Sequence, residues 1–158
     1  MKLKSTLAPW NCILELLQKA YMPDSDITEF VKMIGATEPS PGDQLHMSFR
    51  RMFKRHNYFM LGGTFLIVKI SRTQKPFWGL GKEFIDFANE LNAYFVVLLV
   101  SPQEGWVFSK SDVNANIRAE KWKLRKADNN YKINPPLPEL NAFAGKAKFY
   151  EQLRISGH

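Results

Sequence analysis

Apolar residues recur along this chain first at helical spacing and then at extended spacing. In residues 7–20 they return every three or four positions, which predicts an amphipathic helix. A second, shorter helix is predicted over residues 26–34, where Asp26 begins a capping-box pattern and Gly35 supplies a stop. Two helices are therefore expected before the chain turns extended.

The central part of the chain predicts a helix and a hairpin. From Asp43 onward one helical face is apolar while the rest of the cylinder carries arginine and lysine. Residues 57–61 and 64–71 are rich in β-forming side chains and are separated only by Gly62 and Gly63. We expect a cationic amphipathic helix followed by two antiparallel strands.

A strand buried on both faces is predicted over residues 93–101, which are almost continuously apolar. Residues 72–81 contain one proline and two glycines and are expected to form a loop. A helix built on Phe84, Ile85, Ala88 and Leu91 should follow that loop. The order strand, helix, strand predicts a parallel pair joined by a right-handed crossover.

The last third of the chain predicts shorter elements. A strand over 106–109 is expected, and Ser111 can cap a short helix that ends near Ile117. A second hairpin is predicted from residues 122–126 and 131–133, and a helix over about 140–153. Together the pattern predicts a three-layer α/β fold, with a mixed central sheet of about four to six strands and helices on both faces.

The length of 158 residues fits one domain, since domains commonly have roughly 100–150 residues. We expect residues 1–43 to form helices that pack on a core made by residues 44–134. Residues 140–155 should add the C-terminal helix.

Cys12 is the single cysteine, so no disulfide can form within the chain. A reducing cytoplasm is the expected compartment. The basic amino terminus leads into a helix interrupted by polar residues, unlike a signal peptide. The longest apolar run is far below the roughly 20 residues that span a bilayer, so no membrane partner is expected.

Positive charge is concentrated in the middle of the chain. Residues 1–43 carry four lysines and six acidic residues, a net charge of −2. Residues 44–82 carry eight basic residues and no acidic residue, a net charge of +8, and residues 83–158 carry ten basic against nine acidic residues. An acid-free stretch of this kind predicts an anionic partner, DNA or RNA first among them.

The order helix, hairpin, helix, parallel strand, strand over residues 44–134 resembles the core of the restriction-endonuclease-like, or PD-(D/E)XK, superfamily. In that superfamily the second hairpin strand carries an acid, one further residue and a lysine. Here the segment 64–71 places Lys69 at the lysine position. Residues 105–114 also look like the tail strand and short helix of several of its families. The resemblance implies a nuclease-like fold that meets phosphates near Lys69.

Two positions depart from the superfamily pattern. Ile67 stands two residues before Lys69, where the pattern has an acid, and residues 57–61 contain no aspartate for the other metal ligand. A catalytic Mg²⁺ ion is usually held by one or two carboxylates. Glu83, at the start of the next helix, is the nearest replacement, with Asp86 one turn on and Glu15 or Glu29 as a second carboxylate. An active enzyme would thus use Lys69 and Glu83 with Mg²⁺; no metal site can be named.

The expected phosphate contacts are cations of the acid-free stretch, and Trp78 is a candidate for stacking on an unpaired base beside Phe77. For both rings the alternative is that they fix the loop to the core. A second basic cluster, Arg118 to Lys126, is interrupted by Glu120 and is expected to be ordinary surface. The predicted nucleic-acid-binding residues are Arg50, Arg51, Lys54, Arg55, Arg72, Lys75, Trp78 and Lys82.

Three functions remain open from the sequence. The first is a nucleic-acid-binding protein with a degenerate or rearranged nuclease-like fold. The second is an active metal-dependent endonuclease whose acid has moved to Glu83. The third is an interaction module or inhibitor that binds an acidic protein, because electrostatics alone does not separate two anionic partners.

Overall fold

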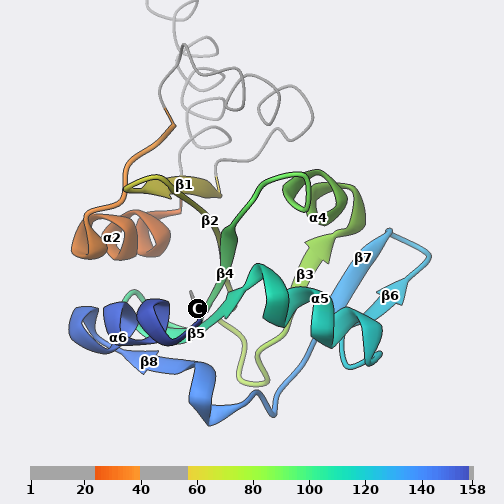
Figure 1. Ribbon diagram of the computed structural model, residues 1–158. Coiled ribbons are helices and arrows are strands. Elements are labelled where there is room, and N and C mark those ends of the chain that lie inside the picture. The colour runs from red at the N-terminus through yellow and green to blue at the C-terminus, as the bar shows by residue number, and fades with distance from the viewer. Residues whose placement is uncertain (1–23, 40–56, 157–158) are drawn as a thin grey trace, which may run out of the picture.

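Two β-sheets organise the part of the chain that the computed structural model describes, residues 24–39 and 57–156 (Figure 1). The larger sheet has five strands in the order β1-β2-β4-β5-β8. The smaller sheet has three, in the order β3-β7-β6. The larger sheet comprises β1 (Tyr58–Leu61), β2 (Thr64–Ile70), β4 (Tyr94–Leu99), β5 (Glu104–Ser109) and β8 (Ala142–Ala144); the smaller comprises β3 (Trp78–Gly81), β6 (Lys123–Arg125) and β7 (Asn130–Ile133).

The predicted hairpin and parallel pair are confirmed. β1 and β2 are antiparallel across the two-residue link, with Leu61 opposite Thr64. β2 and β4 are parallel, with Phe65 opposite Tyr94. All six residues of β4 are buried, as a continuously apolar strand requires when both faces of its sheet are covered. The second predicted hairpin is also present, as β6 and β7.

Helices cover both faces of the five-stranded sheet, so the predicted three-layer α/β architecture is confirmed. In Figure 1, α2 (Ser25–Ile34) and α6 (Lys146–Ser156) lie to the left of this sheet. They bury Phe30 and Phe149 against one face, where Leu66 and Val68 of β2 also point. To the right lie α4 (Lys82–Ala88), α5 (Lys110–Arg118) and the small sheet, over the face that carries Ile67.

The loop predicted over residues 72–81 is wrong in its last four residues, which form β3. Trp78 and Leu80 are buried in the core, and they alternate with Gly79 and Gly81. Pairing of β3 with β7 satisfies the backbone groups of this segment. The apolar alternation therefore outweighed the turn preference of the glycines, a tertiary effect that local composition does not report.

Two helices also begin at other residues than predicted. Asp24, rather than Asp26, caps α2 and accepts hydrogen bonds from the backbone of Asp26 and Ile27, although Gly35 ends the helix as expected with φ 76°. Ser109 caps α5 in a capping box with Asp112, so the helix begins earlier than a cap at Ser111 predicted.

The predicted helix over 140–153 is divided. A 3-10 turn, η2 (Glu139–Asn141), and the strand β8 precede α6, and Gly145 with φ 84° separates the strand from the helix. β8 forms because Phe143 is buried against the same cluster as α6 while its backbone pairs with β5. α4 likewise ends at Ala88, one turn before the predicted Leu91.

The helix predicted over 7–20 and the cationic helix predicted after Asp43 lie outside the described residues. Among the helices that are described, none combines the length and the apolar character needed to cross a bilayer.

Candidate functional site

Lys69 lies near the end of β2, opposite Leu98 of the parallel strand β4. Its side chain shares a sheet face with Ile67 because alternate residues of a strand point the same way. It lines a hollow of about 380 Å³ together with Arg72, Phe77, Gly79 and other residues. The hollow therefore opens where the parallel strands end at their carboxyl side, a common place for ligands in α/β sheets.

Trp78 forms the floor of this hollow rather than a stacking surface. Its side chain is 2% exposed, and its indole N–H donates to the Leu99 carbonyl at 3.1 Å. The ring also meets Trp106 edge to face, with centroids 5.7 Å apart. Trp78 therefore fixes its segment to the core, as the alternative to base stacking predicted. Phe77, which is 52% exposed, is the ring at this site that a base could stack on.

Hydrogen bonds fix the segment that carries Phe77. The Ser71 N–H donates to the Leu99 carbonyl, and the Ser71 hydroxyl accepts from the Phe77 N–H at 3.1 Å. The Thr73 hydroxyl donates to the Lys75 carbonyl at 2.8 Å. Because these bonds hold the rim of the hollow, the exposed ring is kept beside Lys69 without being buried.

Arg72 forms ion pairs with two carboxylates, although the sequence around it contains no acidic residue. Its guanidinium donates to Asp24, and its Nε donates to Asp26 at 3.0 Å, so two carboxylates from α2 reach it across the fold. Partial burial opposes ionisation of Asp24, but hydrogen bonds from Arg72 and from backbone amides outweigh it and lower the pKa of that carboxyl. The hydrogen bonds to Asp24 and Asp26 raise the pKa of Arg72.

The other described cations of the stretch differ in their partners. Lys82 donates to Asp86 one turn further along α4, which raises the pKa of Lys82. Lys75 is exposed and forms no ion pair within the described residues. The remaining predicted contacts, Arg50, Arg51, Lys54 and Arg55, lie outside the described residues.

Ile67, two residues before Lys69, is a core residue. It is fully buried between Tyr58 of β1 and Val96 of β4, its partners in the sheet register. A carboxylate there would lose its hydration, at a cost that the packed apolar neighbours do not offset. The apolar character of this position is thus part of the packing of the sheet.

Glu83 and Lys69 line different hollows. Glu83 is exposed in the first turn of α4, beside a hollow of about 220 Å³. The lining of that hollow and the lining of the Lys69 hollow share Asn130.

The other carboxylates expected for a metal site lie elsewhere. Glu29 is exposed on α2, in the layer on the other side of the five-stranded sheet, and Glu15 lies outside the described residues. Across 24–39 and 57–156 no group of three or more histidine, cysteine or acidic residues is placed to hold a metal ion.

The small sheet presents a polar surface that the sequence analysis missed. Gly79 pairs with Lys132 and Gly81 with Asn130, while Lys132 and Asn130 pair in turn with Lys123 and Arg125. Residues directly opposite in an antiparallel pair point to the same face. We call this surface the open face; its members are Gly79, Gly81, Lys123, Arg125, Asn130 and Lys132.

The opposite face of the small sheet is part of the core. Trp78, Leu80, Tyr131 and Ile133 are all buried in the cluster that includes Ile67. In β3 and β7 these buried residues alternate with the residues of the open face, a period of two that the sequence contains. The period was not recognised in β3 because Gly79 and Gly81 give that segment the composition of a loop.

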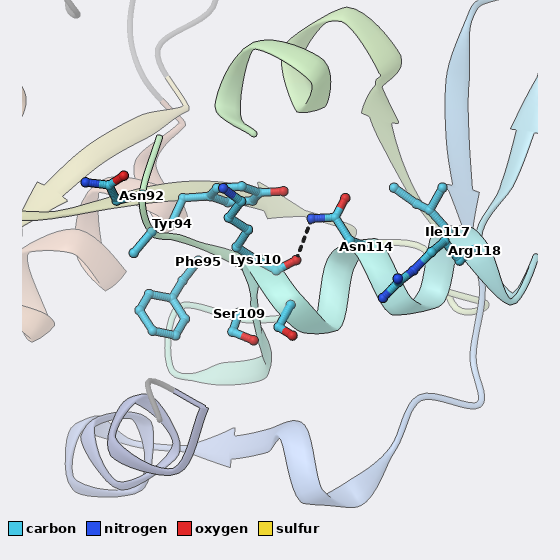
Figure 2. A pocket seen from close by; sticks show the side chains of 10 residues that line it. Asn92, Tyr94, Phe95, Ser109, Lys110, Asn114, Ile117 and Arg118 are labelled. Carbon is cyan, nitrogen blue, oxygen red and sulfur yellow. Dashed lines mark hydrogen bonds between the residues drawn. The ribbon is translucent and has the colours of Figure 1, made fainter. Parts of the chain in front are cut away.

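A larger hollow, about 680 Å³, lies beside the start of α5 (Figure 2). Its polar groups serve the fold: the Lys110 amine donates to the carbonyls of Asn89 and Leu91, and Asn114 and Asn89 exchange hydrogen bonds. Figure 2 shows the Asn114 amide donating to the Lys110 carbonyl as well. Burial raises the pKa of Tyr94, whose hydroxyl donates to Asn89. The amine of Lys110 is therefore already engaged by the fold, while Arg118, the other cation that lines this hollow, is exposed.

Comparisons with protein-family models, with curated proteins and with solved structures found no match for this chain.

Proposed function

We propose that this protein binds nucleic acid at the hollow around Lys69, on a nuclease-like fold whose usual acid position has become part of the core. The observation that carries the proposal is the make-up of the hollow. It places Lys69, with Arg72 and an exposed Phe77, at the carboxyl ends of parallel strands. A nucleotide chain can bind at such a site because its phosphates pair with cations and its bases stack on an exposed aromatic ring.

The carboxylates near the hollow are compatible with this role. Arg72 is 52% exposed in its ion pairs with Asp24 and Asp26, and exposed pairs contribute only about 0.2–1 kcal/mol to stability. A phosphate can compete for such a guanidinium at small cost. Lys75 needs no such exchange because it is exposed without an acidic partner among the described residues. The lone Cys12 favours the cytoplasm as the site of this binding.

The test is a binding titration with labelled single- and double-stranded DNA and RNA, followed by fluorescence anisotropy at several salt concentrations. The wild-type chain should bind, with an affinity that falls steeply as salt is added. Lys75→Glu should weaken binding by about tenfold, because a charge-assisted contact becomes a repulsion. The control is Lys32→Glu, which changes the net charge equally on exposed surface of α2, in the opposite layer.

Three results would contradict or redirect the proposal. Absence of binding at low salt would overturn it, and a salt-resistant complex with an acidic protein would then favour the interaction module. Equal weakening by Lys75→Glu and Lys32→Glu would show that only net charge matters. Cleavage that requires Mn²⁺ and is lost in both Lys69→Ala and Glu83→Ala would identify an endonuclease in place of a pure binding protein.

A further inference from the structure

Resting on the proposed function, we infer that the open face of the small sheet is the second half of the interface, and that the face receives single-stranded nucleic acid. The Lys69 hollow is continuous with this face, since Gly79 and Asn130 belong to both. Phe77 precedes β3 by one residue, so it continues the alternation of Gly79 and Gly81. An exposed ring therefore stands at one margin of the face.

The glycines leave the β3 edge of the open face low. A Cβ placed on Gly79 would meet only ordinary contacts, the nearest being Asn130 and the Lys132 amine of the same face at 3.8 and 3.9 Å. At Gly81 the nearest atom would be Asn130 Oδ1 at 3.5 Å. β3 itself places no side chain on this side, so a ligand over this strand would meet the Asn130 amide and the Lys132 amine.

The charge of the open face is positive and largely uncompensated. Lys123 and Arg125 are exposed, and neither forms an ion pair with any described residue. Lys132 pairs with Asp128 at 3.2 Å; burial opposes ionisation of Asp128, but bonds from Lys132 and Asn130 outweigh it and lower its pKa. Lys123 stands directly opposite Lys132, a like-charge arrangement that disfavours the sheet and that Asp128 offsets from the side of Lys132.

These features select a single strand as the occupant. Neighbouring β-strands are about 4.8 Å apart, so the row from β3 to β6 is about 10 Å wide. That width matches roughly three stacked nucleotides, given about 3.4 Å for each along a strand. Stacking on Phe77 requires an unpaired base, and Lys132, Lys123 and Arg125 then neutralise the phosphates beside it.

The experiment compares two double variants that change net charge equally. Lys123→Glu with Arg125→Glu reverses the open face, whereas Lys32→Glu with Lys146→Glu reverses exposed positions on the helices of the opposite layer. Anisotropy with a labelled single strand should show at least a tenfold loss of affinity for the first and less than about threefold for the second. The slope of log affinity against log salt should fall by about 1.4 in the face variant, since each lost phosphate contact removes about 0.7.

A second measurement uses the unaltered chain and so does not depend on how a variant folds. The amines of Lys123 and Lys132 should be protected from acetylation when the single strand is bound, while Lys146 and Lys148 stay reactive. Phe77→Ala should weaken binding of the single strand more than binding of a duplex of the same sequence.

The outcomes separate this inference from the proposed function. Wild-type binding that is weakened by Lys75→Glu but not by the face variant, without protection of Lys123, would overturn the inference alone. Tighter binding of duplex than of single strand, with no effect of Phe77→Ala, would overturn its choice of ligand. Failure of the wild-type chain to bind either form would overturn both.

Discussion

The five-stranded sheet is covered on both faces, whereas the three-stranded sheet packs one face on the core and leaves the other open. The difference appears in their sequences: β4 is six apolar residues in a row, while β3 and β7 alternate large apolar residues with glycine, asparagine or lysine. A strand buried on both faces has no position to spare for a ligand. In this protein the small sheet supplies the polar surface, and the large sheet supplies the stability on which it rests.

The largest effect should come from placing a charge in the large sheet. Ile67→Asp would remove a fully buried apolar side chain and place a carboxyl group in the core. We expect a loss of at least about 4 kcal/mol in the free energy of unfolding, which combines the lost apolar packing with the cost of burying a carboxyl group. Denaturant unfolding measures it, with Leu140→Asp, at a site 86% exposed, as the control. A loss below about 1 kcal/mol would mean that this position tolerates a carboxyl group.

The next largest difference should separate Trp78, the first residue of β3, from Phe77, the residue before it. Trp78→Ala would cost about 3–5 kcal/mol, because the buried ring contacts Trp106 and donates to the Leu99 carbonyl. Phe77→Ala, one residue earlier and half exposed, should cost less than about 1 kcal/mol. Chemical denaturation of both variants compares them directly. Similar losses for the two would contradict the assignment of one ring to the core and the other to the surface.

Two glycines provide a milder comparison between the sheets. In Gly105→Ala the new Cβ would lie 2.1 Å from the Leu98 carbonyl oxygen, so the large sheet must shift, at a cost of about 1–3 kcal/mol or more. In Gly79→Ala it would meet nothing closer than 3.8 Å, and stability should be unchanged or raised by up to about 1 kcal/mol. Thermal unfolding of the pair checks this. A destabilised Gly79→Ala would indicate that the open face is covered.

The smallest effect should come from the ion pairs beside the Lys69 hollow. Asp24→Asn keeps an acceptor for the helix cap but loses the charge that meets Arg72, and about 0.5 kcal/mol should be lost at neutral pH. The pKa of Asp24 is lowered in the folded protein, so its contribution is present above about pH 4 and disappears as pH falls through that lowered pKa.

Unfolding measured from pH 7 down to pH 3 should therefore show the wild type and Asp24→Asn converging at the acid end. Glu29→Gln on the same helix is the matched control, since Glu29 is exposed. A difference that persists unchanged at pH 3 would assign the effect of Asp24→Asn to capping rather than to charge.

The large sheet was predictable from sequence because its signals are local and mutually consistent. A two-glycine link between β-forming segments fixed the hairpin, and a continuous apolar run fixed β4 as a strand covered on both faces. β8 was missed because Ala142–Ala144 is short and its strand form depends on pairing with β5, a partner distant in sequence.

The candidate site was only partly predictable. Lys69 could be placed at the end of β2 from the strand pattern, but the pairing of Arg72 with Asp24 joins residues 48 positions apart and leaves no local trace. The open face assembles cations from β6 and β7 with glycines from β3, and no single segment displays it. Counting charges along the sequence therefore identified the acid-free stretch, but it could not show that Asp24 and Asp26 lie beside Arg72 in the fold.

The position of β6 at the margin of its sheet has a consequence for self-association. An edge strand exposes backbone groups that a second copy of the chain can pair with, and charged side chains on such a strand oppose that pairing. Lys123 and Arg125 would oppose it here, whereas a bound polyanion or a substitution to valine would remove the opposing charge. The two side chains that we propose as phosphate contacts would then also limit pairing of β6 with another copy of the chain.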